Sequence, residues 1–152
     1  MKILFAFLLT VFSASYALAQ TQAPTPDPTG LWLTENKRAV VKIDRCGQSL
    51  CGNIHWIIEG GMQTDAKNPD ASKRGQPMCG LPILYGFKQN QKNLKVWESG
   101  KIYKADEGDV YNATLSVTSP NKLYLRGYVG VPLLGKTQYW DRVSEKDYPK
   151  CK

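Results

Sequence analysis

The sequence predicts an all-β fold, an antiparallel up-and-down barrel of about eight strands. Apolar and polar residues alternate along several short runs, which is the period of a half-buried strand. Turns rich in glycine, asparagine and proline join most of these runs, and short connections place neighbouring strands antiparallel. This many strands form either a sandwich or a barrel. Closure removes the exposed edges, and such a barrel holds packed side chains or one small ligand.

The first 19 residues have the features of a secretory signal peptide. A positively charged start precedes the apolar residues 3–12, and Ala17-Leu18-Ala19 is a small-x-small cleavage site. The apolar run is too short to span a membrane, so we expect a periplasmic or secreted protein cleaved near Ala19. Residues 20–29 are proline-rich and predict a flexible leader. Residues 30–152 are expected to form a single barrel domain.

The formal net charge is +7, and the lysines are scattered rather than grouped. This pattern is typical of a solvated surface, with weak attraction to anionic envelope components as the alternative. An exported chain without a basic stripe does not suggest nucleic acid as a partner. No cofactor is predicted.

Residues 38–58 predict a β-hairpin whose two strands flank a turn at residues 47–50. One register sorts polar from apolar side chains on both strands, and a slip by one residue would destroy that sorting. It pairs Cys46 with Cys51, Asp44 with Asn53 and Lys42 with His55 on the outer face, and Ile43 with Ile54, Val41 with Trp56 and Ala39 with Ile58 on the inner face. Val40 and Ile57 are apolar exceptions on the outer face.

Four cysteines in an exported chain suggest disulfides, with three possible pairings. The hairpin register favours Cys46–Cys51, and Cys79–Cys151 follows by elimination, with free Cys79 and Cys151 as the alternative. A metal site at the CxxxxC segment is not favoured, because no histidine or cysteine pair accompanies it at zinc spacing.

The other strands follow in order along the chain. We expect them at residues 30–34, 81–89, 94–98 continuing through 101–104, 109–117, 122–129 and 135–143. Opposing Leu115 with Leu125 also brings Ala113 to Gly127 and Tyr111 to Val129, so the register of this hairpin is self-consistent.

Residues 59–80 show neither the helical nor the strand periodicity of apolar residues, so we expect a loop. A loop this long in a compact domain is often functional. Asp65, Asn68 and Asp70 could suggest a cation site, but side chains that cap a turn before proline are the favoured interpretation. An enzyme that uses Asp65 and Arg74 of this loop is one hypothesis for the function.

Small-molecule cavities are lined by aromatic residues with a few convergent polar groups, although buried aromatics more often just fill a core. The candidate ligand-binding residues are Trp56, Asp65, Asn68, Arg74, Trp97, Tyr103, Tyr111 and Arg126. His55, the only histidine, is predicted on the outer face without a serine nucleophile motif, so no catalytic residue is assigned.

Two motifs at the ends of the chain resemble the small-barrel pattern of lipocalins and related calycins. Gly30-x-Trp32 and Trp140-x-Arg142 match it, which implies a tryptophan across the closed end with a basic side chain over it.

A more extensive resemblance is to the bacterial exported family called domain of unknown function 2147. The matching residues are Gly30-Leu31-Trp32, Cys46-Gly47, Leu50-Cys51-Gly52, Asp65-x-x-Asn68-Pro69, Arg74, Pro77, Cys79-Gly80-Leu81, Trp97-x-x-Gly100-x-Ile102-Tyr103, Gly108-x-x-Tyr111, Arg126-Gly127-Tyr128-x-Gly130 and Trp140-x-Arg142. Lys104-Ala105 departs from the family pattern, which tends to carry a proline here. The resemblance implies a small periplasmic β-barrel and no established activity.

Three functions are therefore considered, in order. The first is a soluble periplasmic barrel that binds a small amphipathic or apolar ligand. The second is an envelope interaction module that uses Tyr124, Arg126 and Tyr128, which share one predicted outward face. The third is a hydrolase or transferase built on the 59–80 loop.

Overall fold

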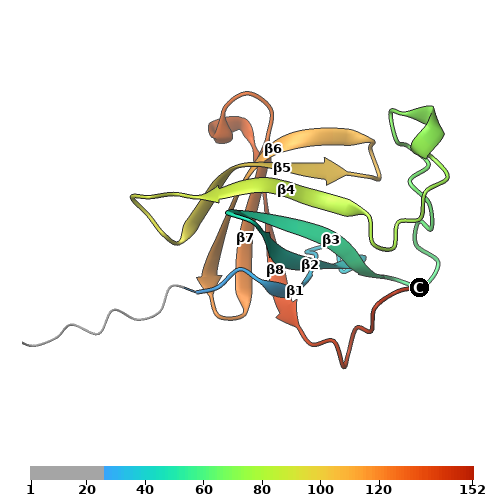
Figure 1. Ribbon diagram of the computed structural model, residues 1–152, viewed down its shortest axis with the longest axis horizontal. Coiled ribbons are helices and arrows are strands. Elements are labelled where there is room, and N and C mark those ends of the chain that lie inside the picture. The colour runs from blue at the N-terminus through green and yellow to red at the C-terminus, as the bar shows by residue number, and fades with distance from the viewer. Residues whose placement is uncertain (1–25) are drawn as a thin grey trace, which may run out of the picture.

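The computed structural model describes residues 26–152, and these form a closed antiparallel β-barrel (Figure 1). The strands are β1 (Gly30–Leu33), β2 (Ala39–Cys46), β3 (Ser49–Ile57), β4 (Pro82–Gln89), β5 (Val96–Lys104), β6 (Asp109–Ser119), β7 (Lys122–Tyr128) and β8 (Lys136–Val143). Each strand pairs with the next in the chain, and β8 pairs with β1. The predicted fold class is confirmed. The predicted signal peptide and residues 20–25 of the predicted leader lie outside the described residues.

The first hairpin forms with a register two residues away from the predicted one. Asp44 pairs with Cys51 and Ile43 with Gly52, because the turn consists of two residues, Gly47 and Gln48, rather than four. Two-residue turns are the usual connection in hairpins, and glycine supplies the positive φ of 64°. A shift of two keeps every side chain on its face, so the predicted sorting survives the error.

A β-bulge at His55 overturns three predictions for β3, including that of Ile57, which packs against the core instead of lying on the outer face. Val41 pairs with Ile54 but Val40 pairs with Trp56, which leaves His55 as the extra residue. An extra residue inverts the alternation beyond it, so Trp56 points to the outer face instead of the inner one. His55 is buried rather than exposed, since its Nε2 lies 3.1 Å from the Tyr148 carbonyl oxygen.

The C-terminal segment covers this outer face. The Tyr148 ring meets the Trp56 ring edge-on at 5.0 Å, and the Cys151 amide donates to the His55 carbonyl at 2.8 Å. Val40, the predicted apolar exception on the outer face, is fully buried although it lies outside the barrel core. The exception in the alternation therefore marks a surface that another segment of the chain covers.

The hairpin of β6 and β7 has the predicted register. Leu115 pairs with Leu125 and Ala113 with Gly127, and all but the glycine are buried. Val129 was expected to point inward opposite Tyr111. It instead lies beyond the end of β7 and is exposed.

Both predicted disulfides form. Cys46 and Cys51 are joined across the first hairpin with Cα atoms 5.8 Å apart, and Cys79 and Cys151 are joined with Cα atoms 5.7 Å apart. The second bond attaches the C-terminus to the loop that precedes β4 (Figure 1).

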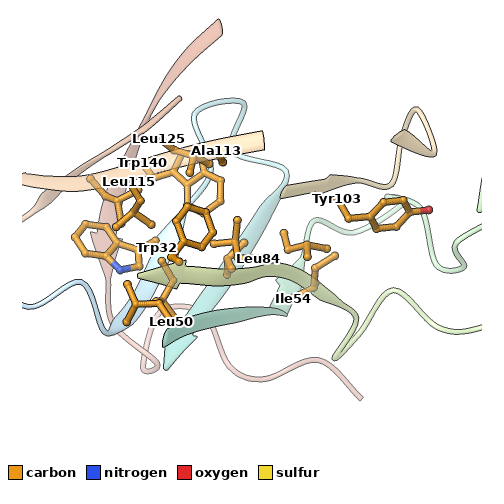
Figure 2. Close-up of a cluster of buried hydrophobic side chains, with 14 of the residues drawn as sticks. Trp32, Leu50, Ile54, Leu84, Tyr103, Ala113, Leu115, Leu125 and Trp140 are labelled. Carbon is orange, nitrogen blue, oxygen red and sulfur yellow. The ribbon is translucent and has the colours of Figure 1, made fainter. Parts of the chain in front are cut away.

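The core cluster reaches from Tyr103 at one end of the barrel to its bulkiest side chains at the other. Trp32 and Trp140 lie side by side there, among leucines contributed by β3, β4, β6 and β7 (Figure 2). The largest fully buried side chains are Trp32, Trp140, Phe87, Ile43, Leu50, Leu84, Leu115, Leu123, Leu125, Val40, Val41 and Asp65. We call this packed end, where β1 begins and β8 ends, the closed end. The opposite end, with the loops 34–38, 58–81, 105–108 and 129–135, is the open end.

Candidate functional site at the open end of the barrel

Arg142 seals the closed end. Its guanidinium carbon lies 4.1 Å from the centre of the Trp32 ring. Its three nitrogens donate to the carbonyl oxygens of Pro120, Thr29 and Asp27 at 2.7, 2.8 and 2.7 Å. The last residues of the predicted leader are thus attached to the barrel and lie across this end.

Gly30 makes room for that guanidinium. It has a positive φ of 121°, and a Cβ at this position would lie 2.6 Å from Nη1 of Arg142. Glycine adopts such a backbone conformation without steric cost. The four residues expected at barrel closure, Gly30, Trp32, Trp140 and Arg142, are therefore brought together as the lipocalin resemblance implied.

Trp97 belongs to this packed end and lies away from the open end. It is buried in the core, and the guanidinium carbon of Arg45 lies 5.2 Å from its ring centre. The structure therefore places Trp97 among the aromatics that fill the core and not in the predicted ligand site.

At the open end, Asp65 anchors the long 59–80 loop. It is fully buried, and its Oδ1 accepts from the Tyr103 hydroxyl at 2.6 Å. Its Oδ2 accepts from the side-chain amides of Asn68 at 2.6 Å and Gln76 at 3.0 Å. Burial alone would raise the pKa of Asp65, but the three hydrogen bonds prevail and lower it. The carboxylate is charged and has both oxygens occupied.

The other polar residues of this loop cap its turns. The side chain of Asn68 accepts from the Asp70 amide at 2.9 Å, and Asp70 accepts from the Ser72 amide at 3.0 Å. Exposed Arg74 donates from Nε to the Asn68 carbonyl at 2.9 Å. These contacts agree with the interpretation of Asn68 and Asp70 as turn-capping residues.

The loop also packs on the turn between β5 and β6. A Cβ on Gly108 would lie 2.1 Å from the Lys67 carbonyl oxygen, and Gly108 has a positive φ of 83°. Only glycine permits this close approach of two backbones.

Two adjacent cavities open at this end. The larger has a volume of about 510 Å³ and lies against β5 to β8. The smaller has a volume of about 160 Å³ and is lined by Ile54, Met62, Met78, Ile83, Tyr103 and other residues of β3 to β5, β8 and the neighbouring loops. Ile102, Lys104 and Gln138 line both cavities. Drug-sized ligands occupy pockets of about 300–1,000 Å³. The larger cavity lies within that range and the smaller one lies below it.

The residues of the larger cavity follow strand periodicity. Ile102 and Lys104 alternate on β5, Leu125 and Gly127 on β7, and Lys136 and Gln138 on β8. Residues two apart share a face, so these side chains point to the inside of the barrel. Lys104, Lys136 and Gln138 were not among the predicted site residues, although the alternation that placed Leu125 and Gly127 inside would have found them.

Charged groups stand at the mouth of the larger cavity. Lys104 forms an ion pair with Glu107, and Tyr111 donates to Oε2 of Glu107 at 2.8 Å. These bonds raise the pKa of Lys104 and lower that of Glu107. Lys136 also lines this cavity, and it has no carboxylate within ion-pair distance among residues 26–152. The larger cavity therefore has an apolar interior, and the charged side chains at its mouth, Lys104, Glu107 and Lys136, carry a net positive charge.

The predicted ligand-binding residues are thus divided among different places. Tyr103 and Tyr111 line the cavities, and Asp65 and Asn68 fix the loop behind Tyr103. Trp56 packs against the C-terminal segment outside the barrel. Arg126 points outward and donates to Thr137 Oγ1 and to two backbone carbonyls of the 129–135 loop.

A family model described as "Uncharacterized protein conserved in bacteria (DUF2147)" matches residues 30–142. The chain belongs to this family. The matched DUF2147 segment starts at the first residue of β1 and ends on β8, so it covers every strand of the barrel. Two disulfides in a bacterial DUF2147 protein are consistent with export.

One solved structure resembles this DUF2147 chain and is described as "Protein HP1028 from the human pathogen Helicobacter pylori belongs to the lipocalin family". The TM-score is 0.71 at 20% sequence identity, and the similarity covers 81% of this chain and 87% of that chain. This likeness shows a lipocalin-like barrel. No curated protein matches the chain.

Two further properties concern the described residues alone. No helix within residues 26–152 has the length and apolar character needed to cross a membrane. No three metal-ligating side chains come together in the same part of the chain.

Proposed function

We propose that this DUF2147 protein is a periplasmic carrier that binds one small amphipathic molecule with an anionic head group. The observation that carries this proposal is the division of the barrel interior. The closed end is packed with tryptophan and leucine, whereas the open end holds the two adjacent cavities. The apolar part of the ligand would enter the cavity beside Ile102, Leu125 and Gly127.

The cavity rim gives the preference for an anionic head group. Glu107 is already neutralised by Lys104 and accepts from Tyr111, whereas Lys136 has no such partner among the described residues. A ligand carboxylate or phosphate beside Lys136 would complete the charge balance. Such a pair at an exposed rim adds modest affinity and sets the orientation of the ligand.

The two other hypotheses find less support in the geometry. Asp65 is fully buried and both its oxygens accept hydrogen bonds from side chains of its own chain, so it is not exposed to a substrate. Tyr124 packs against Tyr139 at 5.8 Å and Arg126 binds its own chain, which describes a cross-strand ladder rather than a free recognition face. Tyr128, the third residue of that face, lines the larger cavity.

Titration calorimetry with two ligands of similar chain length and opposite charge tests the proposal. We expect decanoate to bind more tightly than decyltrimethylammonium. Gly127→Leu should abolish the binding of both ligands, because the leucine side chain would fill the larger cavity. The backbone can accept this side chain, since a Cβ at position 127 would lie 3.6 Å from its nearest neighbour, on Ile102. Gly75→Leu is the matched control, since nothing lies within 4 Å of a Cβ at that loop position.

The charge preference has its own pair of variants. Lys136→Gln should weaken decanoate binding by up to about fivefold, the upper end of the range for an exposed ion pair. Lys95→Gln, at the closed end, should leave it unchanged. Equal binding of the anionic and cationic ligands, or full affinity in the Gly127→Leu protein, would contradict the proposal. Native mass spectrometry of the protein from its own periplasm would then identify the resident molecule.

A further inference from the structure

The most exposed apolar side chains of the described residues gather in one short loop at the open end. In the loop between β7 and β8, residues 129–135, Val129 is 71% exposed, Val131 54%, Leu133 85% and Leu134 79%. Water-soluble surfaces rarely place four large apolar side chains within six residues, and such patches mark interaction sites.

Three carbonyls and two amides of this loop are hydrogen-bonded within the protein. Arg126 donates from Nε to the Pro132 carbonyl at 2.7 Å and from Nη2 to the Leu133 carbonyl at 3.1 Å. The amides of Leu134 and Gly135 donate to the carbonyls of Val131 and Pro132 at 3.2 and 3.0 Å. Entry into hydrocarbon requires that backbone polar groups find partners inside the protein, because lipid tails offer none. Arg126 therefore satisfies the carbonyls of Pro132 and Leu133, while the apolar side chains of the loop point to solvent.

We propose that residues 129–134 are a membrane-docking loop that inserts Val129, Val131, Leu133 and Leu134 into the surface of a lipid bilayer. The small size of the loop favours lipid over a second protein. A stable protein interface uses about 20–30 residues from each partner, whereas this patch comes from seven residues. A few apolar side chains with a nearby cation suffice for shallow insertion at a bilayer interface.

Docking in this way would point the barrel mouth at the membrane. Val129 and Leu134 belong both to the loop and to the lining of the larger cavity, and Lys136 follows directly. Lys136 is placed to meet lipid phosphates, and the net charge of +7, which is +6 without Lys2 of the predicted signal peptide, adds long-range attraction to an anionic bilayer. Docking itself needs no ligand in the cavity, so it can be measured independently of the proposed carrier function.

Co-sedimentation with lipid vesicles tests the inference. The full chain is expressed, and the protein recovered from the periplasmic fraction is used. The vesicles contain phosphatidylethanolamine and phosphatidylglycerol in one arm and phosphatidylcholine alone in the other. We expect partitioning into both, stronger on the anionic vesicles, with binding retained at high salt because the apolar side chains supply most of it.

The variant Val131→Asn/Leu133→Asn removes two exposed apolar side chains that line neither cavity. It should lower the vesicle partition coefficient at least about tenfold, since burying one leucine contributes at least that factor. Leu94→Asn is the control, because Leu94 is 49% exposed at the closed end. It should partition like the unchanged protein. Both variants should bind decanoate normally in vesicle-free solution, which separates a failure of docking from a failure of the pocket.

Four results would overturn the inference. They are equal partitioning of the loop variant and the unchanged protein, loss of all binding at high salt, absence of binding to either vesicle, and dimer formation that the loop variant abolishes without any vesicle binding. A Leu133→Trp probe gives a second readout. Its emission should shift to shorter wavelength on vesicles and be quenched by brominated lipid, and an unquenched probe would also refute the docking loop.

Discussion

The hydroxyl of Tyr103 on β5 donates a 2.6 Å hydrogen bond to the buried carboxylate of Asp65, which lies 38 positions earlier in the chain. This bond joins the long 59–80 loop to the barrel wall at the mouth of the smaller cavity. Figure 2 shows the tyrosine at the edge of the core cluster, with its oxygen directed away from the two tryptophans. The position of the loop over the open end depends on this contact.

Replacing Tyr103 by phenylalanine should lower the free energy of unfolding by about 1.5–3 kcal/mol, the range for a hydrogen bond to a charged group. The buried Asp65 carboxylate would lose its donor on Oδ1. Urea denaturation followed by tryptophan fluorescence measures the change. Tyr139→Phe is the control, because Tyr139 is exposed. A Tyr103→Phe protein as stable as the control would show that the bond does not anchor the loop.

Asp65→Asn should destabilise the protein in a pH-dependent way. The hydrogen bonds hold the folded-state pKa of Asp65 below its ordinary value of 3.8, so the charged carboxylate stabilises the fold above that pH. This contribution is lost as the pH falls through the folded-state pKa. We expect a deficit of about 2–3 kcal/mol at neutral pH that shrinks below pH 3.8. Urea midpoints of both proteins from pH 7 to pH 3 measure it, and a deficit that is independent of pH would contradict the assignment.

The alternation of side chains was sufficient to predict the barrel and much of its pairing. Leu115 with Leu125 and Ala113 with Gly127 could be paired correctly because both strands alternate without interruption. Trp56 could not be placed, since the bulge at His55 reverses the alternation. That bulge packs against the C-terminal segment, more than ninety positions later in the chain. The residues around His55 do not indicate a contact with so distant a segment.

Removal of each disulfide should cost a different amount of stability. In the chain-entropy model the cost grows with the length of the closed loop. Cys79→Ser/Cys151→Ser opens a separation of 72 residues and should cost about 4 kcal/mol. Cys46→Ser/Cys51→Ser opens a separation of 5 and should cost about 2 kcal/mol. Chemical denaturation of the two double variants compares them.

Hydrogen exchange adds a local test of the longer disulfide. Without it the C-terminal segment should detach from the outer face of β2 and β3, because Cys151 would no longer hold Tyr148 against Trp56. The amides of Val40 and Trp56 should then exchange faster. Unchanged protection of both amides would mean that the segment stays bound without the covalent link.

Arg142→Lys should weaken the closed end although the positive charge remains. A lysine ammonium cannot reach the three carbonyls of Asp27, Thr29 and Pro120 together, nor stack flat on Trp32. We expect a loss of about 2 kcal/mol in thermal or urea unfolding. Arg45→Lys is the control, because that guanidinium lies over Trp97 at the longer distance of 5.2 Å and is half exposed. Equal effects of the two substitutions would contradict the specific role of Arg142.

The site itself was harder to predict than the fold. Tyr103 and Tyr111 were found because aromatic residues were considered as the lining of a pocket. Arg126 was assigned to a ligand, whereas its guanidinium binds carbonyls of a loop that has no regular period. Whether an interior is packed or hollow depends on side-chain volumes summed over all eight strands, and no single run of sequence contains that sum.

Pairing of β8 with β1 places the last strand of the chain beside the first. During synthesis, Leu31 and Trp32 therefore have one unbonded flank until residues 141–143 arrive. The N-terminal half cannot finish folding while the rest is still being delivered, and a truncated chain would expose an open strand to its neighbours. Maturation of this protein thus waits for the complete polypeptide.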